Sequence, residues 1–157
     1  MPNHCNNQLT LANGGNILDV LNPYIIDAGE MGGGYREYEF DFQSIIPMGD
    51  ELLKTNDWYD WRVENWGTKW NGYNGIFNDD QTAFTFSTAW SPPLPIIKKL
   101  AELTGESFVL GYIEYGMFFC GQYKASPEGE YDDYYDDINN APKELLDILG
   151  YEEVEYV

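Results

Sequence analysis

Alternating apolar and polar residues predict several β-strands in this chain. The clearest alternation runs through residues 84–90, where one face carries Phe84, Phe86, Thr88 and Trp90. Successive side chains of a strand point to opposite faces of a sheet, so this segment has one apolar and one polar face. Shorter alternations predict strands at 7–12 and at 38–42, the second ending near 45–47, and two strand-like runs at 108–114 and 117–123 predict a hairpin.

Apolar residues spaced three and four positions apart predict helices between these strands. The first helix is expected over residues 16–26, although Pro23 would bend or divide it. The second begins after two prolines at 92 and 93 and ends at Gly105. Its apolar stripe consists of Ile96, Ile97, Leu100 and Leu103.

The order of these elements predicts an α+β, ferredoxin-like fold. A strand, a helix and a strand are followed by an insertion, and then by a strand, a helix, a strand and a hairpin strand. This order is typical of an antiparallel sheet with two helices on one face. The insertion at 48–71 is rich in tryptophan, with a helical turn expected at 51–54 and chain turns at Gly72 and Gly75.

Negative charge is concentrated at the C-terminal end. The 157 residues contain 27 acids and 8 bases, a net charge of −19, and 43% are hydrophobic, enough for a folded core. Residues 126–157 hold eleven of the acids and one base. We therefore expect a ferredoxin-like domain at 1–125 and an acidic C-terminal extension at 126–157, with a short helix at 142–150 and a strand or tail at 151–157.

The acidic segment, residues 128–137, alternates carboxylates with tyrosines. Tyrosine is common at protein interfaces, so we predict that this segment contacts a partner. Two other interpretations stay open: a solvated loop that keeps the protein in solution, or a calcium site built from its aspartates, which lack the EF-hand order. The predicted contact residues are Glu128, Glu130, Tyr131, Asp132, Asp133, Tyr134, Tyr135, Asp136 and Asp137.

Five tryptophans lie close together in the sequence, at 58, 61, 66, 70 and 90. Such a cluster is typical of aromatic packing at one end of a sheet, with Arg62 or Lys69 stacked on a ring. The alternative is a binding pocket or interface hot spot, because tryptophan is enriched there. The candidate pocket residues are Trp66, Lys69, Trp70 and Trp90.

Catalytic patterns are weak in this sequence. Nucleophilic catalysis needs a base beside the nucleophile, and the one histidine, His4, is next to Cys5 near the N-terminus. Two cysteines and one histidine do not form a zinc motif, and the acids show no pattern that selects a catalytic pair. The glycines at 32–34 lack the Lys-Ser or Lys-Thr of a phosphate-binding loop. We therefore expect a binding protein without cofactor rather than an enzyme.

The two cysteines and the apolar segments of the sequence indicate the cellular compartment of the protein. Cys5 and Cys120 are expected to be reduced thiols, the alternative being a bridge if the first and last strands are neighbours. The sequence lacks the apolar N-terminal segment of a signal peptide and any apolar run of membrane-spanning length. These features predict a cytoplasmic protein that does not bind membranes.

Three short motifs carry a family resemblance. They are Met1-Pro2-Asn3 followed by Cys5 and Asn7, then Glu64-Asn65-Trp66-Gly67-Thr68-Lys69-Trp70, then Phe86-Ser87-Thr88-Ala89-Trp90-Ser91-Pro92-Pro93. Together they resemble the YubB ferredoxin-like family of small phage and plasmid proteins, although His4 stands where an aromatic residue is common. The resemblance covers residues 1–124 and leaves the acidic tail after Pro127 outside. It implies a ferredoxin-like fold and carriage on bacterial mobile elements, and it supplies no catalytic residues.

Charge, resemblance and the absence of a catalytic motif together predict an inhibitor. An acidic surface repels nucleic acid and attracts basic proteins. We expect the chain to bind a basic, nucleic-acid-handling host defence protein, such as a CRISPR effector or a restriction nuclease, with carboxylates in place of phosphates. The alternatives are an enzyme with a small-ligand or nucleotide pocket near the Trp-rich insertion, and a self-assembling phage accessory protein. The sequence leaves the oligomeric state open.

Overall fold

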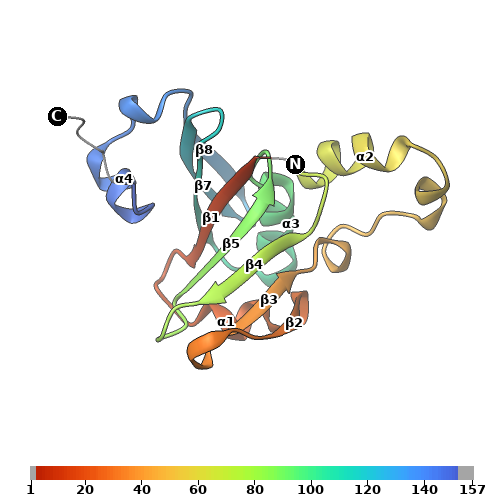
Figure 1. Cartoon of the computed structure of the whole chain (residues 1–157), viewed down its shortest axis with the longest axis horizontal. Helices are drawn as coiled ribbons and strands as arrows, with labels where there is room; N and C mark the ends of the chain where they lie inside the picture. The colour runs from red at the N-terminus through yellow and green to blue at the C-terminus, as the bar shows by residue number, and fades with distance from the viewer. Residues whose placement is uncertain (1–2, 152–157) are drawn as a thin grey trace.

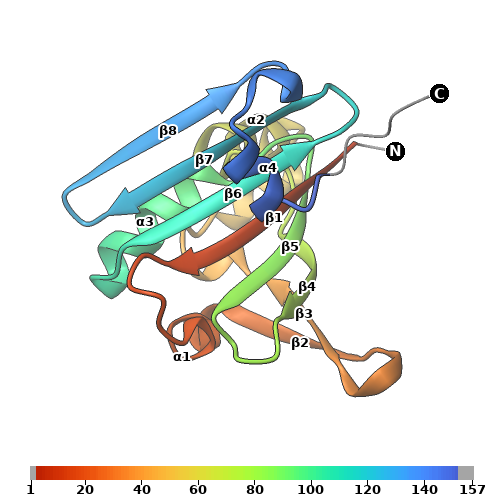
Figure 2. The ribbon, with the colours of Figure 1, turned by 90° about the vertical axis from the view of Figure 1, so that its left-hand side faces the viewer.

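Eight strands form one antiparallel sheet in the computed structural model, which describes residues 3–151 (Figures 1 and 2). The strands follow the order β2-β3-β4-β5-β1-β6-β7-β8 across the sheet. They are β1 (His4–Leu11), β2 (Ile25–Glu30), β3 (Arg36–Phe40), β4 (Gly72–Phe77), β5 (Ala83–Ala89), β6 (Phe108–Glu114), β7 (Phe119–Ser126) and β8 (Gly129–Tyr135). The α-helices are α1 (Ile17–Leu21), α2 (Asp57–Trp66), α3 (Leu94–Thr104) and α4 (Lys143–Ile148).

The ferredoxin-like unit lies at the centre of this sheet. Its four strands are neighbours in the order β4-β5-β1-β6, and β1 is antiparallel to both β5 and β6. Helix α1 follows β1 and helix α3 connects β5 to β6, which gives the two β-α-β halves of the fold. The predicted ferredoxin-like α+β fold is confirmed. The segment β2, β3 and α2 is inserted before β4, while β7 and β8 extend the sheet beyond β6.

The main hydrophobic core lies between the sheet and helices α1 and α3, on the side that we call the helix face. Leu9, Phe84 and Leu110, on the three central strands, are fully buried there against helix residues such as Ile17 and Ile97. Burying side chains of this size stabilises the fold by about 1.5–3 kcal/mol each. Helix α3 ends, as predicted, at a glycine in the left-handed conformation, Gly105 with φ of 75°.

Helix α4 packs on the opposite face of the sheet, which we call the open face (Figure 2). A second, smaller core forms there from Ile113, Cys120, Ile138 and Leu145. Gly111 provides the space for α4, because a side chain at this position would lie 2.9 Å from Leu149. The predicted C-terminal helix is therefore present. The open face is covered by α4 only in part.

The helix predicted over residues 16–26 is shorter than expected. Asn16 does cap α1, accepting a hydrogen bond from the Asp19 backbone at 3.1 Å, but α1 ends at Leu21. Pro23 lies in a 3-10 turn, Asn22–Tyr24, after which β2 starts at Ile25. The prediction was wrong beyond residue 21 because the β-branched pair at 25–26 favours a strand.

The insertion contains more regular structure than its sequence indicated. The chain leaves the sheet after Phe40 into a 3-10 turn, so the strand expected to continue to 45–47 ends earlier. The helical turn predicted at 51–54 is present as a 3-10 helix, Asp50–Lys54. Helix α2 was not predicted, because its three tryptophans were interpreted as a cluster without helical spacing.

Strand β4 was predicted as a pair of turns because it contains Gly72 and Gly75. Both glycines make room for aromatic rings of neighbouring strands. A side chain at Gly72 would lie 2.9 Å from Phe40 and from Phe86, and one at Gly75 would overlap the ring of Phe84. A glycine in a strand can mark a close approach of neighbouring side chains as well as a turn. Gly72 and Gly75 mark such an approach, and for this reason the prediction of turns was wrong.

The acidic segment forms the edge strand β8, which extends the sheet. It pairs with β7 through a two-residue turn at Pro127-Glu128, so the domain boundary expected at residue 125 falls within this hairpin. Aspartate is rare in strands, but charged residues are common on edges, where they oppose aggregation. The strand or tail expected at 151–157 lies outside the described residues from position 152 onward.

Candidate functional site

Strand β8 gathers the predicted contact residues on both of its faces. It pairs with β7 on one side, and within residues 3–151 its other edge has no strand partner. Because Asp132 is opposite the buried Tyr123, the helix face of β8 carries Glu130, Asp132 and Tyr134. The open face carries Tyr131, Asp133 and Tyr135, while Glu128 lies in the preceding turn and Asp136 and Asp137 follow the strand.

Two buried tyrosines hold carboxylates of β8 on the helix face. The Tyr112 hydroxyl, from β6, donates to Asp132 Oδ1 at 2.7 Å, and the Tyr123 hydroxyl, from β7, donates to Glu130. Burial and the neighbouring carboxylates raise the pKa of both tyrosines, so both hydroxyls keep their protons. Sequence reasoning missed these two residues. A signal was available, since both fall on the core face of predicted strands, where a tyrosine hydroxyl needs a partner.

A cavity of about 680 Å³ separates β8 from α3 on the helix face. Lys98 and Lys99 lie on its α3 side, and Glu130 and Asp132 on its β8 side. Lys98 Nζ donates to the Ser126 carbonyl at 2.9 Å and pairs with Glu102 at 3.3 Å, and Lys99 also pairs with Glu102. Within the described residues, therefore, neither β8 carboxylate has a cationic partner.

Partial burial raises the pKa of Asp132, and the nearby Asp133 and Glu130 act in the same direction, against the hydrogen bond from Tyr112. A raised pKa means that the folded state binds the proton more tightly than the unfolded chain does. The ionised form of Asp132 therefore costs stability above its unfolded pKa. This cost disappears as the pH falls and the carboxyl group is protonated.

Replacing Asp132 with Asn is consequently expected to stabilise the protein at neutral pH. The amide oxygen can still accept from Tyr112, while the negative charge close to Asp133 and Glu130 is removed. We expect a gain of roughly 0.5 kcal/mol, kept small by solvent screening, that vanishes near about pH 3, where an aspartate is largely protonated. Urea unfolding at both pH values measures it. Asp136→Asn, at an exposed site, controls for the lower net charge, and an equal gain in both variants would contradict the argument.

The tryptophans divide into a buried and an exposed group. Trp66 is 2% exposed, and its indole Nε1 donates to the Ile46 carbonyl at 2.8 Å. Trp70 and Trp90 are 40% and 42% exposed, and Lys69 Nζ lies 4.2 Å from the ring centre of Trp70. The structure therefore assigns Trp66 to packing.

A cavity of about 480 Å³ lies beside α2, and of the four candidate pocket residues only Trp66 and Trp70 are among those that line it. Arg62 also lines it, with its guanidinium 4.8 Å from the ring centre of Trp66 and 5.1 Å from that of Trp58. Arg62 Nε is buried and has no hydrogen-bond partner within the described residues. Burial lowers the pKa of Arg62, but an arginine stays cationic at neutral pH.

His4 and Cys5 cannot act as a catalytic pair. They are consecutive strand residues and point to opposite faces: Cys5 is buried in the main core, whereas His4 Nδ1 is hydrogen-bonded to the Tyr73 hydroxyl. Burial raises the pKa of the Cys5 thiol to about 12. Cys120 is also buried and unbridged, in the smaller core of the open face.

Between residues 3 and 151, no three His, Cys, Asp or Glu side chains are placed to share a metal ion. Asp132 and Asp133 point to opposite faces of β8. These two aspartates, which the calcium interpretation placed in one site, therefore do not face the same site. No helix in that part of the chain is long and apolar enough to cross a membrane.

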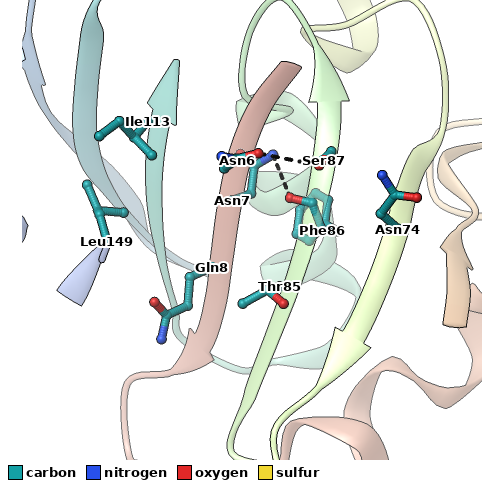
Figure 3. A pocket seen from close by; sticks show the side chains of 9 residues that line it. All are labelled: Asn6, Asn7, Gln8, Asn74, Thr85, Phe86, Ser87, Ile113 and Leu149. Atoms are coloured by element: carbon teal, nitrogen blue, oxygen red, sulfur yellow. Dashed lines mark hydrogen bonds between the residues drawn. The ribbon is translucent and has the colours of Figure 1, made fainter. Parts of the chain in front are cut away.

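A polar groove on the open face was not predicted (Figure 3). One part of it, a cavity of about 260 Å³, is lined by Asn6 and Gln8 of β1, Thr85 and Ser87 of β5, Asn74 of β4, and the apolar Ile113 and Leu149, among others. A second cavity of about 480 Å³ shares Asn6, Asn74 and Ser87 and extends to Asn3, His4, Glu114 and Tyr115. We call both together the open-face groove. The sequence predicted only that the strand at 84–90 has one apolar and one polar face.

Comparison with known proteins gives one family match. The family described as "Ferredoxin-like domain in Api92-like protein" matches residues 65–149. The match includes the second and third sequence motifs except Glu64, and it extends through β8 and α4. The acidic segment thus lies inside the matched domain and is not an addition to it, as the resemblance to residues 1–124 had implied. No curated protein and no solved structure matches the chain.

Proposed function

The chain belongs to the family of ferredoxin-like domains in Api92-like proteins, and from this starting point we propose that it is a binding protein whose acidic segment contacts a basic, nucleic-acid-handling protein. The observation that carries the proposal is the pair of β8 carboxylates fixed by Tyr112 and Tyr123. They lie on an edge strand and have no cationic partner within the described residues. A basic surface would supply that partner.

Three physical features support this role. The net charge of −19 attracts basic proteins over long distances and repels nucleic acid. The free edge of β8 offers backbone groups that can pair with a strand of the partner. Tyr131 and Tyr134 are 62% and 55% exposed, and exposed tyrosines often anchor protein interfaces. Steering by charge followed by tyrosine and carboxylate contacts is the proposed mechanism.

The narrower resemblance to the YubB family suggests the biological setting. Carriage on a phage or plasmid would place the protein in the cytoplasm of a bacterial host. The partner would then be a host defence protein, such as a CRISPR effector or a restriction nuclease. Carboxylates would occupy the positions that nucleic-acid phosphates normally take, so the bound protein would be inhibited.

Affinity purification with the full-length chain tests the proposal. The variant neutralises four acids of the acidic segment: Asp132→Asn, Asp133→Asn, Asp136→Asn and Asp137→Asn. Asparagine keeps the acceptor for Tyr112 and is an equally good helix cap at 137, so the fold should persist. At low salt, about 0.05 M, where charges are weakly screened, the unmodified chain should recover a basic nucleic-acid-binding protein, and the variant should not.

The matched control neutralises four exposed acids elsewhere: Asp57→Asn, Asp60→Asn, Glu64→Gln and Asp79→Asn. It has the same net charge as the test variant and should still recover the partner. Added nucleic acid should compete with the chain for binding to that partner. Equal losses in both variants would mean that only total charge matters. Recovery of no basic nucleic-acid-binding protein would overturn the proposal.

A second candidate function is an enzyme with a small-ligand or nucleotide site beside the Trp-rich insertion. It is favoured by Arg62, which lines the 480 Å³ cavity and stays cationic at neutral pH, because a guanidinium group can bind an anionic group of a ligand. Glu39 and Asp50 also line this cavity and oppose an anion. A thermal-shift screen with nucleotides distinguishes the candidates, since a response that Arg62→Met abolishes would support the pocket.

A further inference from the structure

The open-face groove is almost free of charge, although the protein carries a net charge of −19. Its one acidic residue, Glu114, is fully buried, and its two carboxylate oxygens accept the backbone N–H groups of Gly116 at 2.5 Å and Met117 at 3.0 Å. This carboxylate is thus engaged by its own turn. No lysine or arginine lines the groove within the described residues. The groove is therefore suited to a neutral ligand.

The polar side chains of the groove can both donate and accept hydrogen bonds. Asn6, Gln8 and Asn74 present carboxamides, and Thr85 and Ser87 present hydroxyl groups. Within residues 3–151, the side chains of Gln8 and Asn74 make no hydrogen bond, and Asn6 has only a long one, 3.5 Å, from Ser87. These groups are free to bind hydroxyl groups of a ligand, which also donate and accept.

A β-bulge places Asn74 in this groove. The register between β4 and β5 shifts between Tyr73 and Ile76, and Asn74 has φ of 54°, in the left-handed region. Asparagine tolerates this conformation better than most residues, and a bulge re-aims a side chain, often beside a binding site. Figure 3 shows Asn74 on β4, across β5 from Asn6 and Gln8.

Apolar side chains from the end of β6 and the end of α4 border the polar floor. Leu149 and Ile113 line the first cavity. Tyr115 lines the second and is 46% exposed, stacked on Tyr151 with ring centres 6.2 Å apart. A saccharide combines hydroxyl groups on its rim with apolar C–H faces, so it matches both kinds of surface.

We propose that the open-face groove binds a neutral saccharide of at least two linked rings, one in each cavity, with hydroxyl groups bonded to Asn6, Gln8 and Asn74. A peptide that adds a strand needs a free sheet edge, whereas β1 and β5 are paired on both sides. A nucleic acid needs basic groups to neutralise its phosphates, and the groove has none. The proposal is independent of the partner proposed for β8.

Titration of the ¹⁵N-labelled full-length chain with maltose, cellobiose, lactose and N,N′-diacetylchitobiose tests the proposal. We expect at least one of them to shift the side-chain amide signals of Asn6, Gln8 and Asn74 saturably, at a Kd of about 1 mM or tighter. Gln8→Ala should weaken that binding about tenfold, the effect of one lost hydrogen bond. The variant with four neutralised acids in the acidic segment should bind the saccharide normally, which separates this test from that of the partner.

Gln122→Ala is the matched control, because Gln122 lies on the open face in line with Gln8 and Gly111 but outside the groove. It should leave saccharide binding unchanged, and both variants should keep the native circular dichroism spectrum. The proposal fails if none of the four disaccharides shifts these amides, if Gln122→Ala weakens binding as much as Gln8→Ala, or if adenosine or triglycine binds more tightly.

Discussion

Replacing Trp66 with Ala is expected to lower the free energy of unfolding by about 3–5 kcal/mol, the range for deleting a large buried aromatic side chain. The indole is 2% exposed, and its ring centre lies 5.9 Å from that of Phe42 and 6.1 Å from that of Trp61. Its removal leaves a cavity and deprives the Ile46 carbonyl of a donor. Urea unfolding followed by far-ultraviolet circular dichroism measures the loss without depending on tryptophan fluorescence.

Trp70→Ala is the matched control, because Trp70 is 40% exposed and stacks with Lys69 at the surface. An exposed cation–π contact contributes about 0.5–1 kcal/mol, so this variant should lose far less stability. Equal losses would contradict the division into a buried and an exposed tryptophan. Trp70 and Trp90, rather than Trp66, are then the tryptophans available to a ligand or partner.

The central fold was predictable because its strands have one buried and one wet face. Residues 84–90 alternate for this reason, whereas residues 108–114 form an apolar, strand-like run that is buried on both faces, and the observed strands β5 and β6 match the two predictions within one residue. The prolines before α3 and the left-handed Gly105 after it are local signals that do not depend on the rest of the fold. Together these elements indicated the ferredoxin-like order, but the strand predicted at 38–42 as the second strand of the unit is the inserted β3, and β4 holds that place in the structure.

The strands that were missed have no such pattern. Both faces of β8 carry carboxylates and tyrosines, so hydrophobic alternation is absent, and its pairing with β7 is decided by tertiary contacts. In β4 the informative residues are glycines, whose role depends on the rings of Phe84 and Phe86 from a neighbouring strand. A single sequence does not show which strands become neighbours, and so it could not distinguish these glycines from turns.

The candidate site was predictable in composition but not in arrangement. The carboxylates and tyrosines of the acidic segment are evident in the sequence, whereas Tyr112 and Tyr123, which fix two of the carboxylates, lie on other strands. The open-face groove is assembled from four strands, β1, β4, β5 and β6, and from Leu149 at the end of α4. Its polar residues are divided among these strands and form no motif along the chain.

Replacing Gly121 with Ala is expected to displace β8 and to lower the free energy of unfolding by about 2–4 kcal/mol, from overpacking and a lost hydrogen bond to a charged group. The added methyl group would overlap the hydroxyl end of Tyr112 and lie 2.8 Å from the Asp133 carbonyl oxygen. Either Tyr112 moves and releases Asp132, or β8 moves away from β7. Urea unfolding measures the loss, and hydrogen exchange should accelerate at the β8 amides.

Gly129→Ala is the control within the same hairpin, since a methyl group there meets no atom within 4 Å, and its effect should stay within about 0.5 kcal/mol. Tyr112→Phe removes the hydroxyl group and so identifies the hydrogen-bond part of the loss. If Gly121→Ala acts by breaking the bond between Tyr112 and Asp132, the double variant must be less destabilised than the sum of the two single variants. Strict additivity would show that Gly121→Ala displaces β8 for a reason other than loss of the bond between Tyr112 and Asp132.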